Sequence, residues 1–180
     1  MKFQSLGSCF LGTVCCLLAS CAGIGPSVSV KTDYNHKVSF AGYNTYALDL
    51  GESGLRSTGN AALAEALKTN LATKGINEAA RGKADLIIVP VAFTQEKIHT
   101  MPTGNSTYII DHGGGYRTGD WMINNDVTQY TEGTLVIDFL DRQKRLIVFR
   151  GIGQGAVTTS ERNAIAIREA VQKIVADLPK

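Results

Sequence analysis

The sequence has no marked excess of charge of either sign. Its 180 residues include 18 Lys and Arg against 16 Asp and Glu, which gives a formal net charge of +2. Proteins that bind nucleic acid through its phosphates carry a larger basic excess, so we expect no nucleic-acid partner. Hydrophobic residues make up 44% of the chain. That content excludes intrinsic disorder, and the length fits one globular domain with at most an appendage.

Cysteine is absent after position 21. The four cysteines of the chain are Cys9, Cys15, Cys16 and Cys21. A disulfide framework or a cysteine-based metal site would have its cysteines spread through the domain. We therefore expect neither in the body of the chain.

Residues 1–20 have the features of a secretory signal peptide. Lys2 gives a positive start, and residues 10–18 form an apolar run too short to span a membrane. The sequence Leu18-Ala19-Ser20-Cys21 resembles a bacterial lipobox. This resemblance implies cleavage before Cys21 and its diacylation, with palmitate among the acyl groups, which anchors the chain in a membrane. The alternative is a secretory signal without lipidation, in which Cys21 is only a small residue.

The residues after the lipobox indicate in which membrane the chain is anchored and how far the domain lies from that membrane. An aspartate in place of Ala22 would resemble the inner-membrane retention signal, so Ala22 points to the outer membrane of a Gram-negative bacterium, facing the periplasm. Residues 21–27 form the acylated cysteine and a short flexible tether rich in Gly and Pro. Six residues span at most about 20 Å, so the domain should lie close to the bilayer.

The hydrophobic pattern of residues 28–180 predicts a single α+β domain. The expected strands are 28–34, 43–50, 85–93, 127–140 and 145–151, and the expected helices are 60–74 and one from a capping box at Thr158-x-x-Glu161 to Leu178. A right-handed crossover should make the second and third strands parallel, and the last two strands should form an antiparallel hairpin. The order ββαβ, loop, ββα predicts a two-layer fold, in which two amphipathic helices pack on one face of a mixed five-stranded sheet.

Four local features refine this expectation. Residues 85–93 form a near-continuous apolar run, as in a strand covered on both faces, and Pro90 indicates an edge or a bulge within it. Gly75 is placed as the left-handed stop of the first helix. Residues 151–156 superficially fit a dinucleotide fingerprint, but they follow a hairpin arm and precede the last helix, so we interpret them as a bulged or irregular exit from the sheet. Asp138 and Arg150 are expected to pair across neighbouring strands in a structural role.

Several short stretches together resemble one known family. They are Asp33-Tyr34-Asn35, residues 40–46, Ala84-Asp85-Leu86, residues 132–138 and Phe149-Arg150-Gly151. This combination is similar to the bacterial envelope lipoproteins grouped as domain of unknown function 4136 (DUF4136), over most of residues 28–178. Phe149 stands where a tryptophan is more usual. The family has no established activity, so the resemblance implies a location in the cell envelope and a fold, but no function.

Residues 97–126 are rich in Gly, Asn and Thr and are predicted to form a long loop. Loops of this length in a compact domain are usually functional or disordered. Tyr108, Tyr116 and the only tryptophan, Trp121, fall within it. Aromatic residues on an otherwise polar loop indicate a partner-binding site. The alternative is that these rings fold back and cover the sheet.

The same segment contains the few residues that are candidates for catalysis or metal binding. His112-Gly113-Gly114-Gly115 resembles the oxyanion-hole loop of esterases, but the sequence has no Gly-x-Ser-x-Gly nucleophile motif. His99 and His112, with Asp111 and Asp120, match no familiar metal-binding spacing. We therefore assign no catalytic residue, no metal and no cofactor.

Three hypotheses for function remain. The first and favoured one is a non-enzymatic lipoprotein, anchored in the outer membrane, that serves as an interaction or assembly module for an envelope protein partner. The second is a carrier of a small apolar ligand or lipid held between the helices and the sheet. The third is an envelope hydrolase that uses Asp111, His112 and Asp120.

Overall fold

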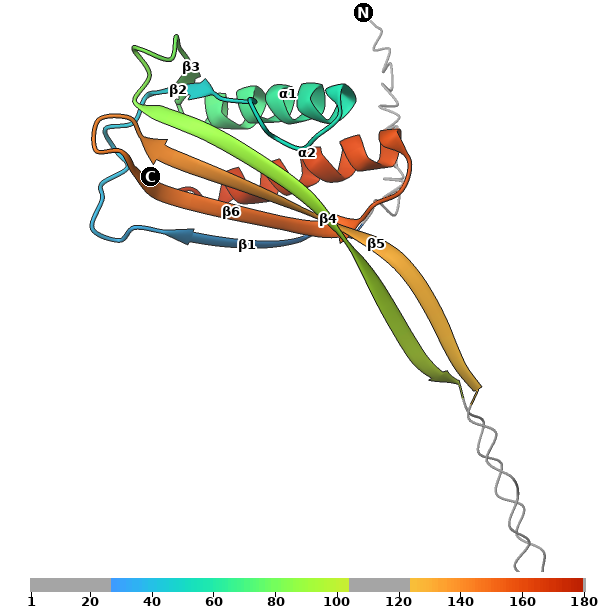
Figure 1. The fold of residues 1–180 in the computed structure, drawn as a ribbon. Helices are drawn as coiled ribbons and strands as arrows, with labels where there is room; N and C mark the ends of the chain where they lie inside the picture. Colours follow the sequence, from blue (N-terminus) through green and yellow to red (C-terminus); the bar gives the residue numbers. More distant parts are fainter. Residues whose placement is uncertain (1–26, 104–123, 180) are drawn as a thin grey trace, which may run out of the picture.

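A computed structural model describes residues 27–103 and 124–179, with side chains described for 27–98 and 127–179. A six-stranded mixed sheet carries two helices on one face (Figure 1), in the strand order β1-β6-β5-β4-β2-β3. The strands are β1 (Ser29–Tyr34), β2 (Thr45–Leu48), β3 (Asn77–Glu78), β4 (Leu86–Thr103), β5 (Asn124–Asp141) and β6 (Leu146–Ala156); the helices are α1 (Ser57–Thr73) and α2 (Ser160–Ala176). The predicted two-layer α+β fold is confirmed. The two-residue strand β3 is one more than the sequence predicted.

The pairing of the strands follows the predicted connections. β2 and β4 are parallel, with Tyr46 opposite Leu86, and α1 lies between them in the chain. β5 and β6 form the expected antiparallel hairpin. β1 pairs with the outer side of β6, also antiparallel.

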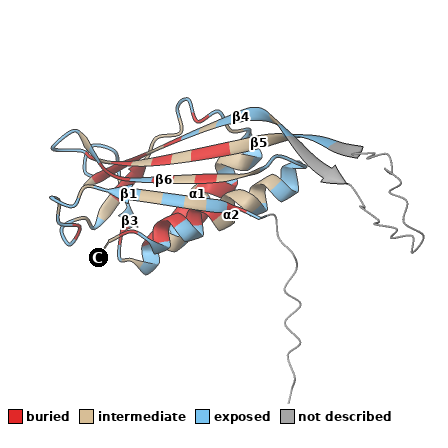
Figure 2. Ribbon diagram, turned by 90° about the horizontal axis from the view of Figure 1, so that it is seen from below, coloured by how far each residue is buried: buried red, intermediate tan, exposed pale blue. Residues whose placement is uncertain are grey.

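The core lies where the helices meet the sheet, as the buried residues in Figure 2 show. The stripe Leu63, Leu67 and Leu71 of α1 is completely buried, as the period of its leucines predicts. From the sheet, Phe139 and Phe149 meet edge to face with ring centroids 5.2 Å apart. Each such side chain stabilises the fold by about 1.5–3 kcal/mol through burial.

The helix ends agree in part with the prediction. Gly75 has a φ of 79° and its N–H donates to the carbonyl of Ala72, so it ends α1 as expected. The predicted capping box at Thr158 is wrong by one residue, because the side chain of Thr159 accepts the hydrogen bond from the N–H of Arg162. The N–H of Thr158 donates instead to the side chain of Asn163.

The long loop predicted at 97–126 is wrong at both ends. Residues 97–103 continue β4 and residues 124–126 begin β5, and the two strands stay paired up to Thr103 and Asn124. They leave the body as a two-stranded arm (Figure 1). The paired residues include several β-branched ones, which favour a strand although Gly and Asn are common next to them in the chain. Residues 104–123 lie outside the described part.

Two predictions about strand irregularities had different outcomes. β2 pairs with β4 only over residues 86–88, so Pro90 faces a free edge on that side, as its missing N–H indicated. The irregular exit predicted for residues 151–156 is wrong, since β6 stays paired with β5 up to Ala156. The bulge lies earlier, next to Phe139.

The glycines of β6 have a packing role instead. A Cβ on Gly153 would lie 2.9 Å from the Cβ of Ala170, and a Cβ on Gly151 would collide with the side chain of Ile174. Both contacts come from α2, so the missing side chains let this helix approach the strand closely.

Candidate binding surfaces

Most of the residues that sequence reasoning selected lie outside the described part. These are the lipid-attachment residue Cys21, the aromatic residues Tyr108, Tyr116 and Trp121, and the hydrolase candidates Asp111, His112 and Asp120. The structure therefore neither brings them together nor separates them. The described residues form three surfaces, of which the first, a groove, lies between the helices and the sheet, where the carrier hypothesis expected a ligand.

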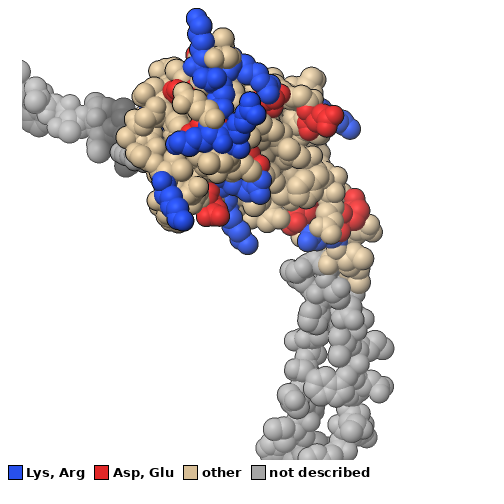
Figure 3. Space-filling model, turned by 60° about the vertical axis from the view of Figure 1, so that its left-hand side comes forward, with Lys and Arg blue, Asp and Glu red and all other residues tan. Residues whose placement is uncertain are grey.

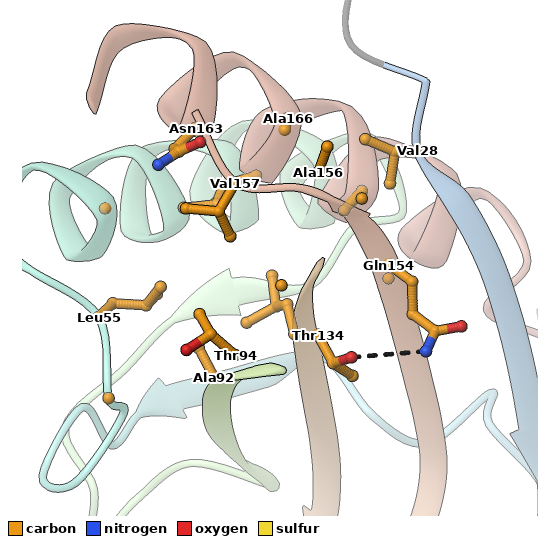
Figure 4. Close-up of a pocket in the computed structure, with 18 of the residues that line it drawn as sticks. Val28, Leu55, Ala92, Thr94, Thr134, Gln154, Ala156, Val157, Asn163 and Ala166 are labelled. Atoms are coloured by element: carbon orange, nitrogen blue, oxygen red, sulfur yellow. Dashed lines mark hydrogen bonds between the residues drawn. The ribbon is translucent and has the colours of Figure 1, made fainter. Parts of the chain in front are cut away.

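The first surface is a groove between the helices and the sheet. It has a volume of about 520 Å³ and lies where α1 and α2 begin, beside residues 92–94 of β4, residues 133–135 of β5 and the end of β6 (Figure 4). Its walls are mainly apolar and are formed by Val28, Leu55, Ala92, Leu135, Val157, Ala166, Ile167 and Ala170. A pocket of this size and lining is typical of sites for small apolar ligands.

Missing side chains keep this groove open. Gly133, Gly153 and Gly155 form part of its lining. A Cβ on Gly133 would lie 2.9 Å from the side chain of Val157, so any larger residue would push into the wall. The glycines themselves are visible in the sequence. The groove depends on which distant residues they meet, and the sequence does not show those contacts.

The polar groups of the groove lie mainly at the end where the two helices begin, which we call its mouth. Arg56, Thr58, Ser160 and Asn163 come from the first turns of the two helices and the residue before α1. Both helices begin at this same end of the body (Figure 1), so their partial positive charges point the same way. On the sheet side, Gln154 donates a 3.4 Å hydrogen bond to Thr134, drawn as a dashed line in Figure 4.

The second surface is the face of the sheet opposite the helices. The first part of β4 is covered on both faces as predicted, since Ile87 and Ile88 are both buried. Further along, the prediction of burial on both faces is wrong: Val91 is 43% exposed and Phe93 is 55% exposed. Val91 pairs with Val136 of β5, which pairs with Ile152 of β6, so the apolar residues continue across three strands. No described residue covers this stripe.

An ion pair lies beside the apolar stripe. Arg150 donates two hydrogen bonds to Asp138, at 2.5 and 2.6 Å, and the pairing predicted from the sequence is confirmed. The hydrogen bonds from Arg150 satisfy both carboxylate oxygens, and the same contact raises the pKa of the Arg150 side chain. Because the two side chains are paired with each other, neither is left as an unpaired acid or base on this face of the sheet.

The third surface is the arm formed by the outer parts of β4 and β5. Ile98 is 70% exposed and Val127 is 61% exposed, both on the arm. Polar contacts across the strands hold it: Thr131 donates to Glu96 at 2.8 Å, and Lys97 lies 3.6 Å from Glu132. Large apolar residues that are this exposed contribute little to the core, which favours a role in contact with another molecule.

The end of the body opposite the arm is basic. Figure 3 shows Lys and Arg side chains gathered there, around the turn that joins β5 and β6. Arg81, Arg142 and Arg145 border a shallow depression whose apolar residues are Ile87, Val89 and Leu140. Arg81 is already paired with Asp49, and Arg142 donates to the carbonyl of Ala84.

Two carboxylates stabilise the same end. Asp85 accepts hydrogen bonds from the hydroxyl of Thr45 at 2.7 Å and from the N–H groups of Thr45 and Asn44, which together lower its pKa. Asp141 is buried, which alone would raise its pKa, but hydrogen bonds from Lys144, Tyr43 and Gln143 outweigh burial and lower it. Hydrogen bonds from this many donors keep both carboxylates ionised, so they stabilise the structure and are poor proton donors.

The described part of the chain contains no group of three or more His, Cys, Asp or Glu side chains placed to hold a metal ion. Among the helices that are described, none is long and apolar enough to cross a membrane.

The described residues thus define a two-layer α+β domain with an apolar groove, an uncovered sheet face and a projecting arm. The sequence model of a family described as "Domain of unknown function (DUF4136)" matches residues 30–180, and the chain belongs to this family.

Solved structures that are similar to this chain come from several bacteria. A PDZ domain protein from Parabacteroides distasonis is 15% identical with a TM-score of 0.56; the match covers 87% of this chain but only 37% of that one. The PelC dodecamer from Paraburkholderia phytofirmans is 9% identical with a TM-score of 0.45, covering 82% and 97% of the two chains. A DUF330 protein from Xanthomonas campestris is 10% identical with a TM-score of 0.38, covering 85% and 89%. No curated protein matches. These similarities concern the fold alone.

Proposed function

We propose that the protein is a lipoprotein of the outer membrane, facing the periplasm, that works as a non-enzymatic interaction or assembly module. Its partner is an envelope protein that contacts the uncovered sheet face and the arm. The observation that carries this proposal is the part of β4 just after Pro90, where Val91 and Phe93 are half-exposed in an apolar run typical of a strand covered on both faces. A contiguous apolar patch of this kind is typical of a protein–protein contact.

The proposed anchor fits this role. The sequence Leu18-Ala19-Ser20-Cys21 supports lipidation, and β1 begins only eight residues after Cys21. A chain segment of this length spans at most about 28 Å, so the domain stays near the bilayer. Tyr108, Tyr116 and Trp121 lie in the sequence between the two strands of the arm, and we keep them as proposed partner-binding residues.

Site-specific photocrosslinking in intact cells tests the proposal. A photoreactive amino acid at Phe93 should capture a defined envelope protein, because this side chain stands in the uncovered stripe. The matched control is the same amino acid at Lys68, an exposed position on α1, on the other side of the sheet. A Phe93 variant that captures nothing, or only what Lys68 captures, would contradict the proposal.

The groove favours a second candidate function, the carrier of a small apolar ligand or lipid. Its 520 Å³ volume lies within the range of ordinary ligand pockets. A neutral fluorescent apolar probe should bind there, and Ala166→Leu should weaken that binding by filling part of the groove. The hydrolase hypothesis rests on Asp111 and His112, and no described group adds to it.

A further inference from the structure

We infer that the groove binds a long-chain fatty acid, with the acyl chain between the helices and the sheet and the carboxylate at the mouth beside Arg56. This inference deepens the carrier function and rests on it, but it is independent of the protein partner. It follows from the shape of the groove, the chemistry of its walls and the charge at its mouth.

The walls suit a single acyl chain. Apart from its polar residues, the lining consists of aliphatic side chains and glycines. Its one aromatic residue, Phe93, directs its ring to the opposite face of the sheet, because Ala92 and Thr94 on either side of it face the groove. The groove has a volume of about 520 Å³ and is open along one side, so it holds part of a long acyl chain and leaves the rest exposed. Each methylene that leaves water contributes about 0.8 kcal/mol, so the buried part of the chain contributes favourably to the affinity.

The mouth suits an anion. Arg56 is the one charged residue that lines the groove, and in the described part of the chain it forms no ion pair. It directly precedes α1, a helix with no side-chain cap and no acidic residue in its first turn. The carboxylate would therefore meet one full positive charge and the positive end of a helix dipole.

The surrounding groups leave this charge available. Glu161 in the first turn of α2 does not line the groove, and its pKa is lowered by hydrogen bonds from its own N–H and from Thr159. Asn163 is held by its hydrogen bond from the N–H of Thr158. Arg56 is exposed, so water solvates it in the empty groove; a carboxylate beside it would gain a modest attraction, and a cationic ligand would be repelled.

The groove also lies close to the proposed tether. Val28 lines the groove and follows directly on residues 21–27. An anchor at Cys21 would therefore hold the groove at the side of the domain nearest the bilayer. Fatty acids partition into that bilayer, so ligand and groove would share one surface.

Calorimetric titration with laurate and with dodecanol tests this inference. The protein is the chain from residue 21 onward with Cys21→Ser, which avoids detergent; its whole core lies in residues 28–178. Laurate should bind up to about fivefold more tightly than dodecanol, since both enter the groove but only the acid pairs with the exposed Arg56. Arg56→Gln should abolish that difference, whereas the control Arg162→Gln, at an exposed position outside the groove, should keep it.

A groove-filling variant separates the possible failures. Ala166→Leu should weaken the binding of both ligands several-fold, with thermal unfolding as the check that the chain is folded. Equal affinities for the acid and the alcohol, or an unchanged preference in Arg56→Gln, would overturn the fatty-acid assignment while leaving a neutral apolar carrier in place. No binding of either ligand would overturn both the assignment and the carrier function.

Discussion

A methyl group added at Gly151 should destabilise the domain through one identifiable contact. The new Cβ would collide with Ile174 of α2, lying 2.8 Å from its Cγ1 and 2.9 Å from its Cδ1. Ile174 is completely buried in the same core cluster as Phe149 and Val171, so it has no free space to turn into. Either the helix must shift or the side chain must leave its preferred rotamer.

The expected size of the effect follows from this geometry. Overpacking of a filled core costs about 1–3 kcal/mol, so Gly151→Ala should lose about 2 kcal/mol of unfolding free energy. In a domain of this size that loss lowers Tm by roughly 4–8 °C. Gly42→Ala is the matched control, since a Cβ there has nothing within 4 Å. It should leave stability unchanged or raise it by up to about 1 kcal/mol.

A double-mutant cycle assigns the effect to the contact. Ile174→Ala alone should cost about 2–5 kcal/mol, because it opens a cavity under β6. In the double variant, the methyl group added at Gly151 enters part of that cavity, so the combined loss should be smaller than the sum by about 1–3 kcal/mol. Urea unfolding of the four proteins measures all terms. A neutral Gly151→Ala, or strictly additive losses, would refute the close packing of α2 on β6.

Three other outcomes are expected. Cys21→Ser should release the domain from the outer-membrane fraction; unchanged fractionation and unchanged mass would contradict the lipid anchor. Trp121→Ala should leave Tm nearly unchanged but weaken capture of the envelope partner in crosslinking, and a loss of several kcal/mol would instead place this ring in a core. Acidification should destabilise the domain, since the folded-state pKa of Asp141 lies below its ordinary value, and the stability it contributes above about pH 4 is lost as pH falls through the folded-state pKa. Asp141→Asn should lose about 1–3 kcal/mol near neutral pH through its weakened contact with Tyr43 and should flatten this pH dependence, as urea unfolding at several pH values would show.

Local patterns in the sequence were sufficient for the main elements. The spacing of Leu63, Leu67 and Leu71 predicts α1 and its buried side. The parallel pairing of β2 with β4 follows from the intervening helix, and the hairpin of β5 and β6 follows from its polar turn. These features depend on residues close together in the chain, where periodicity and turn chemistry are informative.

Features that depend on distant residues were missed. Residues 97–103 become a strand because residues 124–130 pair with them, and the Gly-rich and Asn-rich composition nearby obscured this. The groove depends on Gly133 facing Val157, a contact that no local pattern encodes. The cap predicted at Thr158 lies instead at the adjacent Thr159, whose side chain accepts from the N–H of Arg162.

The uninterrupted pairing of β4 with β5 limits how the arm can vary in length. Leu86 faces Asp141 and Thr103 faces Asn124, and every residue between keeps the same register. One residue inserted into either strand would turn all side chains beyond it to the opposite side of the ribbon. Two residues inserted into each strand would preserve the sides and extend the arm by about 7 Å. Related proteins can therefore change the reach of this arm only in steps of matched residue pairs, unless a bulge absorbs the odd residue.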